Sequence, residues 1–483
     1  MGSELKPHVV VFPFMSQGHI LPLVDLSKAL SDRDILVTII TTPYNSISLR
    51  HLVADYSHNI AVCEIPFPAI RGLPKGCENT TQLPSMEFFV PFLEATKQLQ
   101  KPFEQVLQQL VCQSNKNTIC VISDFFLCWT LSSCQAFGLP RLVFHGMGVL
   151  ALSIIKTAWV HAPSILGPDT SSDDPVHLPG LDIPFVLRVR ELPEGVDRPN
   201  RDDPFTKFMA EVAEAETNSW GIIVNSFSEL EGSYVSCLES FYQNGAKAWC
   251  IGPLSLHDIK RVPLSLNNQH PDEMIMKWLS AKEEHEAKVI YVSFGTQAEV
   301  TDSQLDEVAY GLEESGHPFV WVVRSATWSL PRGMEERVKG KGLFLLRKWV
   351  DQRRILEHAA IGGFMSHCGW NSVLESISVG VPMLAWPMIA EQSLNAKYVV
   401  DGLEAGISMP HNKKSFNNSE KVEGVSREVV CKAVKELMEG ERGKKARERA
   451  QALGRLSRRA IQEGGSSYRA LGDLIDELSH VRV

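Results

Sequence analysis

The chain has 483 residues, of which 44% are hydrophobic and 22% charged, and its 48 basic and 57 acidic residues give a formal net charge of −9. A chain of this length exceeds what one hydrophobic core usually supports, so we expect two domains of similar size. The acidic balance argues against a protein that coats nucleic acid or anionic membrane. No run approaches the roughly 20 apolar residues of a transmembrane helix, so we expect no integral membrane contact.

The N-terminal sequence has too short an apolar run for a signal peptide, and no small-residue cleavage site follows it. The ten cysteines show no zinc-ligand spacing. Free thiols in a reducing compartment are the expected state, which predicts a cytoplasmic protein.

The N-terminal half alternates strands and helices. We expect strands at 8–14, 35–41, 118–123 and 141–145, and helices at 18–30 and 127–137. The strands are runs of apolar residues, typical of strands buried on both faces, whereas apolar residues in the first helix recur at helical spacing. This alternation predicts a doubly wound α/β domain around a parallel sheet.

A second series of the same kind begins late in the chain. Its expected strands are 289–294, 319–324, 362–366 and 382–386, and its expected helices are 302–315, 352–358 and 370–379. Between the two series, residues 252–270 are rich in Pro, Ser, Asn and His, which is typical of a linker. The predicted organisation is an N-terminal domain over 1–251, a linker over 252–275, a C-terminal domain over 276–461 and a terminal helix within 462–483.

Parallel sheets bind ligands at the carboxyl ends of their strands. Four expected strands end in polar residues: His19 and Asp124 follow two of them in the N-terminal half, and Thr296 and His367 follow two in the C-terminal half. These four strand ends are the candidate binding positions.

The segment that follows strand 362–366 reads His-Cys-Gly-Trp-Asn-Ser, and its last three residues, 370–372, open a helix. A helix N-terminus with His, Asn and Ser donors beside it is typical of an anion site. Neither a P-loop lysine nor an Asp-x-Asp pair for magnesium lies nearby. This segment alone is explained equally well by a diphosphate site without metal and by a capped helix around a buried histidine.

Residues 349–392 as a whole favour the diphosphate site, because they resemble the donor-binding signature of plant family 1 UDP-dependent glycosyltransferases. The matching positions are Trp349, Gln352, Leu356, His358, Phe364, Ser366, His367, Gly369, Trp370, Asn371, Ser372, Glu375, Gly380, Val381, Pro382, Pro387, Glu391 and Gln392. The motifs PFMSQGHILP, VISDFF, YVSFGT and EGGSS elsewhere in the chain are also similar to the family. The resemblance implies the GT-B fold, in which two Rossmann-like domains face a cleft and the terminal helix packs back on the N-terminal domain.

The resemblance also implies roles for single residues at the base and the ribose. Trp349 stacks on the uracil, the Val350 backbone hydrogen-bonds the base, and Gln352 and Glu375 hold the ribose. Without the resemblance, a core tryptophan is the favoured interpretation of Trp349, and Glu375 is open to interpretation as a solvated helix residue without a partner.

Further positions match those that hold the diphosphate and the sugar in the family. They are Thr296, His367, Trp370, Asn371, Ser372, Glu391 and Gln392. Many relatives have Asp where this chain has Glu391, so the sugar contact of that residue differs by one methylene.

His19 and Asp124 match the family's catalytic pair. Transfer to a hydroxyl requires a base that removes the proton as the new bond forms, and histidine, with an ordinary pKa of about 6.5, suits this role at neutral pH. A carboxylate on the other ring nitrogen orients the imidazole and stabilises its protonated form. The resemblance thus assigns His19 as the base and Asp124 as its partner.

These inferences predict a monomeric, inverting hexosyltransferase that moves glucose from UDP-glucose to a hydroxyl of a small apolar plant acceptor, a flavonoid or another phenolic. No metal and no cofactor is expected. Two alternatives remain open: transfer to an aromatic carbon of a phenolic acceptor, and a UDP-sugar-binding protein without transfer activity. The acceptor cannot be identified from the sequence.

Overall fold

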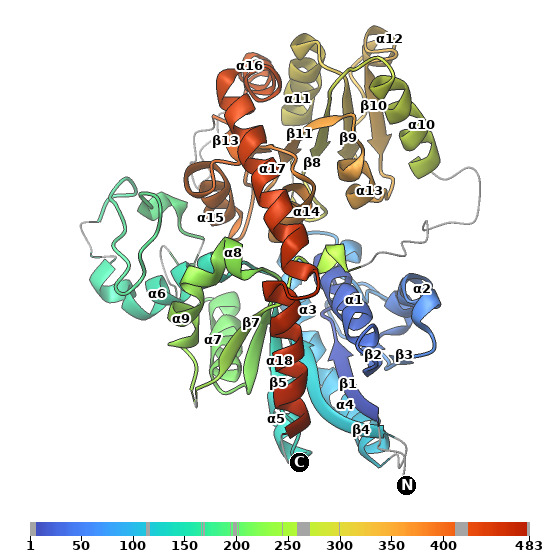
Figure 1. Ribbon diagram of the computed structural model, residues 1–483, viewed down its shortest axis with the longest axis vertical. Coiled ribbons are helices and arrows are strands. Elements are labelled where there is room, and N and C mark those ends of the chain that lie inside the picture. Colours follow the sequence, from blue (N-terminus) through green and yellow to red (C-terminus); the bar gives the residue numbers. More distant parts are fainter. Residues whose placement is uncertain are drawn as a thin grey trace. The chain divides into compact units, whose positions relative to one another are not determined.

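The computed structural model describes residues 6–112, 116–165, 167, 170–193, 195–196, 200, 202–243, 245–257, 271–298, 300–410 and 424–480 (Figure 1). The chain divides into two compact units. Unit 1 comprises Met1–Lys156, Arg198–Leu264 and Arg459–Val483, and unit 2 comprises Thr157–Asp197 and Ser265–Arg458. Each unit therefore combines segments that are distant in sequence.

Unit 1 is built on a seven-stranded sheet in the order β3-β2-β1-β4-β5-β6-β7, with every neighbouring pair parallel. Its strands are β1 (Lys6–Phe12), β2 (Leu36–Thr41), β3 (Ile60–Glu64), β4 (Lys116–Asp124), β5 (Arg141–His145), β6 (Gly221–Val224) and β7 (Lys247–Cys250). The strand order reverses between β1 and β4. That reversal is the place where doubly wound sheets bind ligands.

Helices cover both faces of this sheet. They are α1 (Gln17–Ser31), α2 (Pro43–Leu52), α3 (Phe89–Thr96), α4 (Gln100–Val111), α5 (Thr130–Ala136), α7 (Pro204–Thr217), α8 (Ser228–Glu231), α9 (Val235–Glu239) and α18 (Ser466–His480), and α6 (Val149–Ile165) continues from unit 1 into unit 2. Strand β1 shows why two cores form, because Val9 and Val11 pack into one buried cluster and Val10 and Phe12 into the other. Successive strand residues point to opposite faces, so an unbroken apolar strand needs both faces covered.

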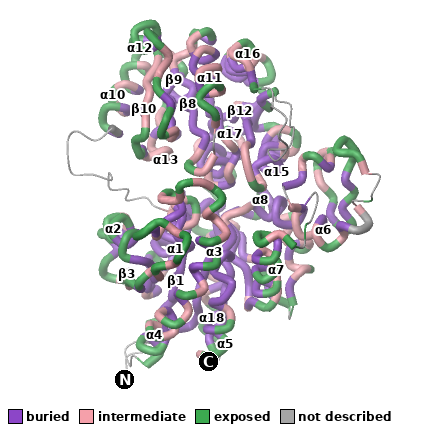
Figure 2. The backbone as a smooth tube through the Cα atoms, turned by 180° about the vertical axis from the view of Figure 1, so that it is seen from behind, coloured by how far each residue is buried: buried purple, intermediate pink, exposed green. Residues whose placement is uncertain are grey.

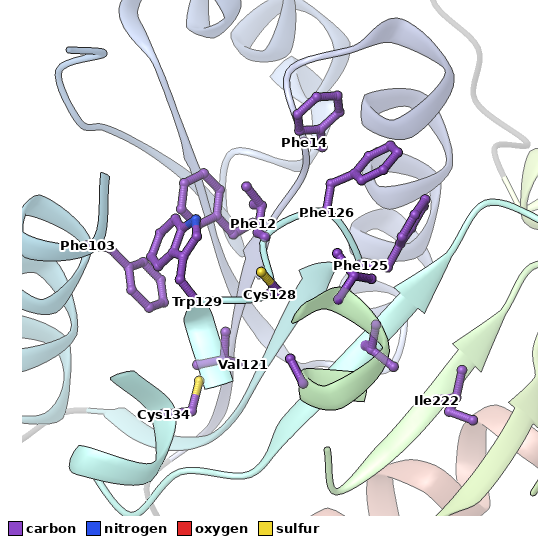
Figure 3. Packing of buried hydrophobic residues seen from close by; sticks show 14 of the residues in the cluster. Phe12, Phe14, Phe103, Val121, Phe125, Phe126, Cys128, Trp129, Cys134 and Ile222 are labelled. Atoms are coloured by element: carbon purple, nitrogen blue, oxygen red, sulfur yellow. The ribbon is translucent and has the colours of Figure 1, made fainter. Parts of the chain in front are cut away.

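The first core of unit 1 contains apolar residues of α1 together with Leu471, Leu474 and Leu478 of α18. The terminal helix is thus part of unit 1, and its buried leucines recur at helical spacing. The second core is rich in aromatic rings. Figure 3 shows Phe12, Phe103 and Trp129 packed together there, with Phe12–Phe103 centroids 5.4 Å apart.

Unit 2 is built on a six-stranded parallel sheet in the order β10-β9-β8-β11-β12-β13. Its strands are β8 (Val289–Ser293), β9 (Phe319–Val323), β10 (Gly342–Leu346), β11 (Ile361–Ser366), β12 (Met383–Ala385) and β13 (Gly406–Ser408). Its helices are α10 (Pro271–Glu283), α11 (Asp302–Ser315), α12 (Met334–Arg337), α13 (Gln352–Glu357), α14 (Trp370–Val379), α15 (Gln392–Lys397), α16 (Arg427–Met438) and most of α17 (Glu441–Ile461). The order again reverses once, between β8 and β11.

The structure places the predicted elements close to their expected bounds. Buried residues form the central strands of both sheets (Figure 2). One segment differs from the contiguous N-terminal domain expected from sequence, because residues 157–197 group with unit 2. Helix α18 groups with unit 1, the unit that contains the expected N-terminal domain's sheet. Most of the expected linker, residues 258–270, lies outside the described residues. Among the described helices, none is both long and apolar enough to cross a membrane.

Candidate active site

His19 and Asp124 form a close pair at the carboxyl edge of the sheet in unit 1. His19 lies in the first turn of α1, Asp124 ends β4, and His19 Nδ1 is 2.7 Å from Asp124 Oδ2. The side chain of Asp124 is fully buried and that of His19 is 21% exposed. Because Nδ1 meets the carboxylate, Nε2 is the nitrogen that can take a proton from a substrate.

The strand order explains how residues 105 positions apart meet. β1 and β4 are parallel neighbours, so the chain that leaves β1 and the end of β4 share one edge. The second oxygen of Asp124, Oδ1, accepts the backbone N–H of Phe126 at 3.0 Å. This hydrogen bond from the turn that follows β4 therefore fixes the orientation of the Asp124 carboxylate that contacts His19.

Arg141, the first residue of β5, forms hydrogen bonds to the end of the neighbouring strand β4. Its guanidinium is fully buried and donates to the hydroxyls of Ser123 and Thr130, each at 2.9 Å, and to Ser219 at 2.7 Å. The guanidinium also lies 3.4 Å from the carbonyl of Asp124. The buried guanidinium of Arg141 therefore fixes the end of β4, which carries the carboxylate of Asp124.

Aromatic rings surround the imidazole of His19. The centroids of Phe14, Phe125 and Phe126 lie 5.3, 5.8 and 5.5 Å from that of His19. Figure 3 shows these three phenylalanines on one side of the core cluster. A histidine with apolar aromatic neighbours can lie beside a ligand that is itself apolar.

The buried histidine at the end of β5 has a different setting. His145, at the end of β5, pairs with the buried carboxylate of Glu216, which Lys156 also contacts at 2.5 Å. Burial alone would raise the pKa of Glu216, but the neighbouring His145 and Lys156 hold it well below its usual range. The carboxylate is therefore a structural anion that holds α6 and α7 together.

In unit 2, His367 follows β11 and its ring lies between two glycines. A Cβ atom at Gly295 or Gly369 would come within 2.7 or 2.6 Å of His367 Nε2, so only glycine leaves room at these two positions. Burial lowers the pKa of His367 to about 4, and the carbonyl of Ser293 offsets this only in part. This low pKa favours the neutral form of His367, which can meet an anion as a hydrogen-bond donor.

Helix α14 begins directly after this histidine, at Trp370. The Trp370 side chain is buried, so its contribution to a ligand can come only from the backbone at the helix N-terminus. Asn371 is half-buried, and Ser372 is buried and accepts a hydrogen bond from Gln352 at 2.9 Å. Thr296 is exposed at the end of β8. Because α14 and the end of β8 meet at the reversal point of the sheet, they can hold an anion there.

Glu375 lies one turn along α14 and is paired on both carboxylate oxygens. Arg353 Nε donates to Oε1 at 2.9 Å and Gln352 Nε2 donates to Oε2 at 2.7 Å. Tyr291 in turn donates to Gln352 Oε1 at 3.2 Å. The view of Glu375 as a solvated residue is therefore wrong. Each carboxylate oxygen retains a second lone pair, so the group can still accept from a diol.

Trp349 lies just before α13 and is not a core residue, because its side chain is 37% exposed. The guanidinium of Arg324 lies 4.8 Å from the centroid of its ring. The side chain of Val350 is buried, so only its backbone groups are available to a ligand. An exposed indole supported by a cation can stack on a planar base.

Glu391 and Gln392 lie where α15 begins, after a turn that includes Ala390 in the left-handed region at φ 53°. Gln392 Oε1 accepts the backbone N–H groups of Met388 and Ile389, both at 3.0 Å. The amide oxygen thus organises the turn, and the amide N–H₂ is the part of Gln392 that can bind a ligand.

Asn395 links this turn to the anion loop, residues 367–369 between β11 and α14. Its amide donates to the carbonyl of Cys368 at 3.0 Å and to Glu391 Oε1 at 3.2 Å. Cys368 has φ 63°, a conformation that non-glycine residues rarely adopt. The amide of Asn395 therefore fixes both the carbonyl of Cys368 and the carboxylate of Glu391, a candidate sugar-binding residue.

Two sequence profiles match the chain. One is described as "Glycosyltransferase, N-terminal domain" and matches residues 6–173. The other is described as "UDP-glucoronosyl and UDP-glucosyl transferase" and matches residues 257–449. UDP-glycosyltransferase 90A1 of Arabidopsis thaliana is 39% identical over 98% of this chain and 97% of its own length. The chain belongs to the plant UDP-glycosyltransferase family. Scopoletin glucosyltransferase of Nicotiana tabacum is 38% identical over 98% of both chains.

Solved structures of this glycosyltransferase family have the same fold. UGT73P12 of Glycyrrhiza uralensis, in complex with glycyrrhetinic acid 3-O-monoglucuronide, has a TM-score of 0.83 at 30% identity and covers 98% of this chain and 95% of its own. UGT2 of Phytolacca americana, with UDP-2fluoro-glucose and pterostilbene, has a TM-score of 0.80 at 26% identity and covers 98% and 100%. The GT-B fold expected from sequence is confirmed, and the family activity is transfer from a UDP-sugar to a small-molecule acceptor.

Several residues of this glycosyltransferase's candidate site were missed from sequence. Arg324 and Arg353 contact predicted donor residues, and Asn395 bridges two predicted loops. The sequence pointed to two of them only through their positions next to predicted site residues: Arg353 follows Gln352 directly, and Asn395 follows Gln392 by three positions. Among the described residues, no group of three or more His, Cys, Asp or Glu side chains could hold a metal ion.

Proposed function

We propose that the protein is an inverting glucosyltransferase that moves glucose from UDP-glucose to a hydroxyl of a small phenolic acceptor, with His19 as general base. The observation that carries this proposal is the 2.7 Å pair of His19 and Asp124, set among three phenylalanine rings. A buried carboxylate on Nδ1 leaves Nε2 as the basic nitrogen and stabilises the imidazolium that forms.

The transfer itself is a displacement at the anomeric carbon. Nε2 of His19 takes the acceptor proton as the acceptor oxygen forms its bond to that carbon, and the bond to the diphosphate oxygen breaks with its electron pair going to UDP. Attack from the face opposite UDP converts the α-linked donor into a β-glucoside. Asp124 remains ionised throughout and pairs with the imidazolium.

On the donor side, we propose that the nucleotide and sugar bind along the carboxyl edge of the unit 2 sheet. Trp349 and the Val350 backbone hold the uracil, and Glu375 with Gln352 holds the ribose. The neutral residues that hold the diphosphate are Thr296, His367, Asn371, Ser372 and the N-terminus of α14 at Trp370. Fixed donors of this kind stabilise the charge that develops on the leaving group.

The choice of glucose and of a phenolic acceptor is supported by two relatives. One relative is named as a glucosyltransferase of scopoletin, and one related structure contains a fluorinated UDP-glucose together with pterostilbene. Both acceptors are phenolic. Glu391 and Gln392, at the start of α15, are the proposed contacts of the glucose hydroxyls. We further propose that the protein acts as a monomer in the cytoplasm without a metal.

A mass-spectrometric screen of phenols with UDP-glucose tests the proposal, with released UDP measured in parallel. The expected product carries one added hexose that acid releases, which marks an O-glucoside. An acid-stable product would assign transfer to carbon instead. Absence of any product, together with tight UDP-glucose binding, would assign a binding protein. Addition of EDTA should leave the rate unchanged, and a loss that magnesium or manganese restores would contradict the metal-free site.

A further inference from the structure

Residues 157–197 lie between β5 and β6 of unit 1 in sequence but belong to unit 2 in the structure. Part of this segment forms its own hydrogen-bonded loop, in which the backbone N–H groups of Val176 and Val189 donate to the carbonyls of Leu187 and Asp174 at 2.7 and 3.1 Å. A 3₁₀ turn of this segment, η5 (Val189–Glu191), ends at Glu191. We refer to residues 184–191 as the strap.

The strap is attached to α15. The carbonyl of Glu191 accepts the Ser393 hydroxyl at 2.9 Å, and its carboxylate accepts Lys397 Nζ at 3.0 Å. The same carboxylate also accepts the backbone N–H of Arg188 at 2.7 Å, which fixes its orientation within the strap. The side chains of Lys397 and Glu191 are only 17% and 21% exposed. This pair is therefore less screened by solvent and salt than a typical surface ion pair.

Helix α15 has six residues and continues directly into a π-helical segment, Tyr398–Gly402, of five residues, so it belongs to a short helical segment that needs such anchors. A helix this short is not stable by itself and depends on tertiary contacts. Ser393 and Lys397 are four residues apart and so lie on one face, whereas Asn395 points to the opposite face. Asn395 ties its face to Cys368 of the anion loop, and Glu191 ties the other face to the strap.

We propose that Glu191 is a positioning residue for the sugar-binding turn, so that the strap takes part in selecting the donor sugar. The proposal rests on the proposed function, because Glu391 and Gln392, which begin α15, are the assigned sugar contacts. With Glu191 in place, α15 is held on both faces and the amide of Gln392 has one position. Without the Glu191 carboxylate, this face of α15 keeps the hydrogen bond from Ser393 to the strap backbone but loses the ion pair of Lys397 with the strap. The sugar contacts then lose their alignment, while the uracil and diphosphate sites remain intact.

The test compares the binding of UDP-glucose and of UDP by calorimetry without acceptor, for the wild type, Glu191→Gln, Lys397→Met and the double variant. UDP lacks the sugar, so the ratio of the two affinities isolates the sugar contacts. We expect each single variant to weaken UDP-glucose about three- to ten-fold relative to UDP. The double variant should lose no more than either single variant, because both remove the same link.

The matched control is Asp401→Asn. Asp401 is the other carboxylate partner of Lys397, at 3.2 Å, but is 46% exposed and lies outside the strap. This variant should keep the wild-type ratio. Equal weakening of UDP and UDP-glucose in Glu191→Gln, or additive losses in the double variant, would overturn the proposal, as would an unchanged ratio in a folded Glu191→Gln protein.

A second measurement separates this inference from the proposed function. The preference for UDP-glucose over UDP-galactose in transfer should shrink in Glu191→Gln and stay unchanged in Asp401→Asn. If the wild type transfers no glucose to any phenol, the proposed function fails, while the binding ratios still test the strap. If the wild type transfers glucose and the strap variants keep its sugar preference, only the strap proposal fails.

Discussion

His19 in unit 1 and His367 in unit 2 both lie at the carboxyl edge of a parallel sheet, yet their surroundings give them opposite chemistry. His19 is 2.7 Å from a buried carboxylate and is partly exposed, so it has both a partner for its charged form and access to substrate. The ring of His367 lies between Gly295 and Gly369, and burial lowers its pKa to about 4. The comparison teaches that a strand-end position alone does not suit a histidine to act as a base; the histidine also needs a carboxylate on its other nitrogen and access to substrate.

The largest expected effect comes from removing the base. His19→Ala should lower kcat on an alcohol acceptor by about 10²–10⁴-fold, the usual contribution of general-base catalysis. UDP-glucose affinity, measured by calorimetry, should be nearly unchanged because the base meets the acceptor and not the nucleotide. Asp124→Asn should lose less, since the imidazole remains but its orienting charge is gone. A His19→Ala enzyme with more than half of its activity would remove His19 from the catalytic role.

Much of this arrangement could be predicted from the sequence, because local signals are strong there. The expected helix 302–315 agrees with α11 at both ends, where the Thr301 hydroxyl caps the first turn and Gly316 adopts the left-handed conformation at the last. The meeting of His19 with Asp124 follows from two strands of a parallel sheet ending at one edge.

The remaining features depend on contacts between distant segments that leave no periodic pattern. Neither the pairing of Glu191 with Lys397 nor the grouping of residues 157–197 with unit 2 has a local sequence signal. Arg353 would be interpreted as a solvated helix residue, and only the tertiary structure shows that it pairs with Glu375. Long-range ion pairs of this kind are decided by packing, so sequence reasoning finds the strand ends of a site before it finds the residues that orient them.

The next largest effect is expected at the nucleotide site in unit 2, where a substitution should change KM for UDP-glucose and not kcat. Trp349→Ala should raise the UDP-glucose KM by about ten- to hundred-fold, since stacking on a base is worth about 1–3 kcal/mol. Stacking is present before and during transfer, so kcat should change little. Trp349→Phe, which keeps a ring, is the matched control and should lose less. An unaltered donor KM in Trp349→Ala would show that the ring does not contact the nucleotide.

A smaller effect is expected at the sugar. Gln392→Ala should lower UDP-glucose turnover about ten-fold, because a sugar hydroxyl loses its hydrogen-bond partner, while UDP inhibits at its original concentration. Gln392→Glu retains an oxygen for the N–H groups of Met388 and Ile389, so it separates the role in the turn from the role in binding. Equal losses for UDP and UDP-glucose would place the damage in the nucleotide site.

The smallest effect sharpens the comparison of the two histidines. A histidine whose pKa is about 4 stays neutral above roughly pH 5.5, so UDP-glucose affinity should be flat from there to about pH 8.5. A histidine that became cationic on the diphosphate would instead raise the affinity as the pH falls through about 6.5. Calorimetry with UDP-glucose across this range distinguishes the two, and a rise in affinity toward low pH would contradict the neutral assignment of His367.

The most direct test of the account is the anomeric configuration of the product formed from UDP-glucose and a simple phenol, determined by proton NMR. Displacement by a hydroxyl that His19 deprotonates, on the face opposite UDP, predicts a single β-O-glucoside. An α-glucoside would contradict the account, because it requires a second displacement or attack from the same face as UDP.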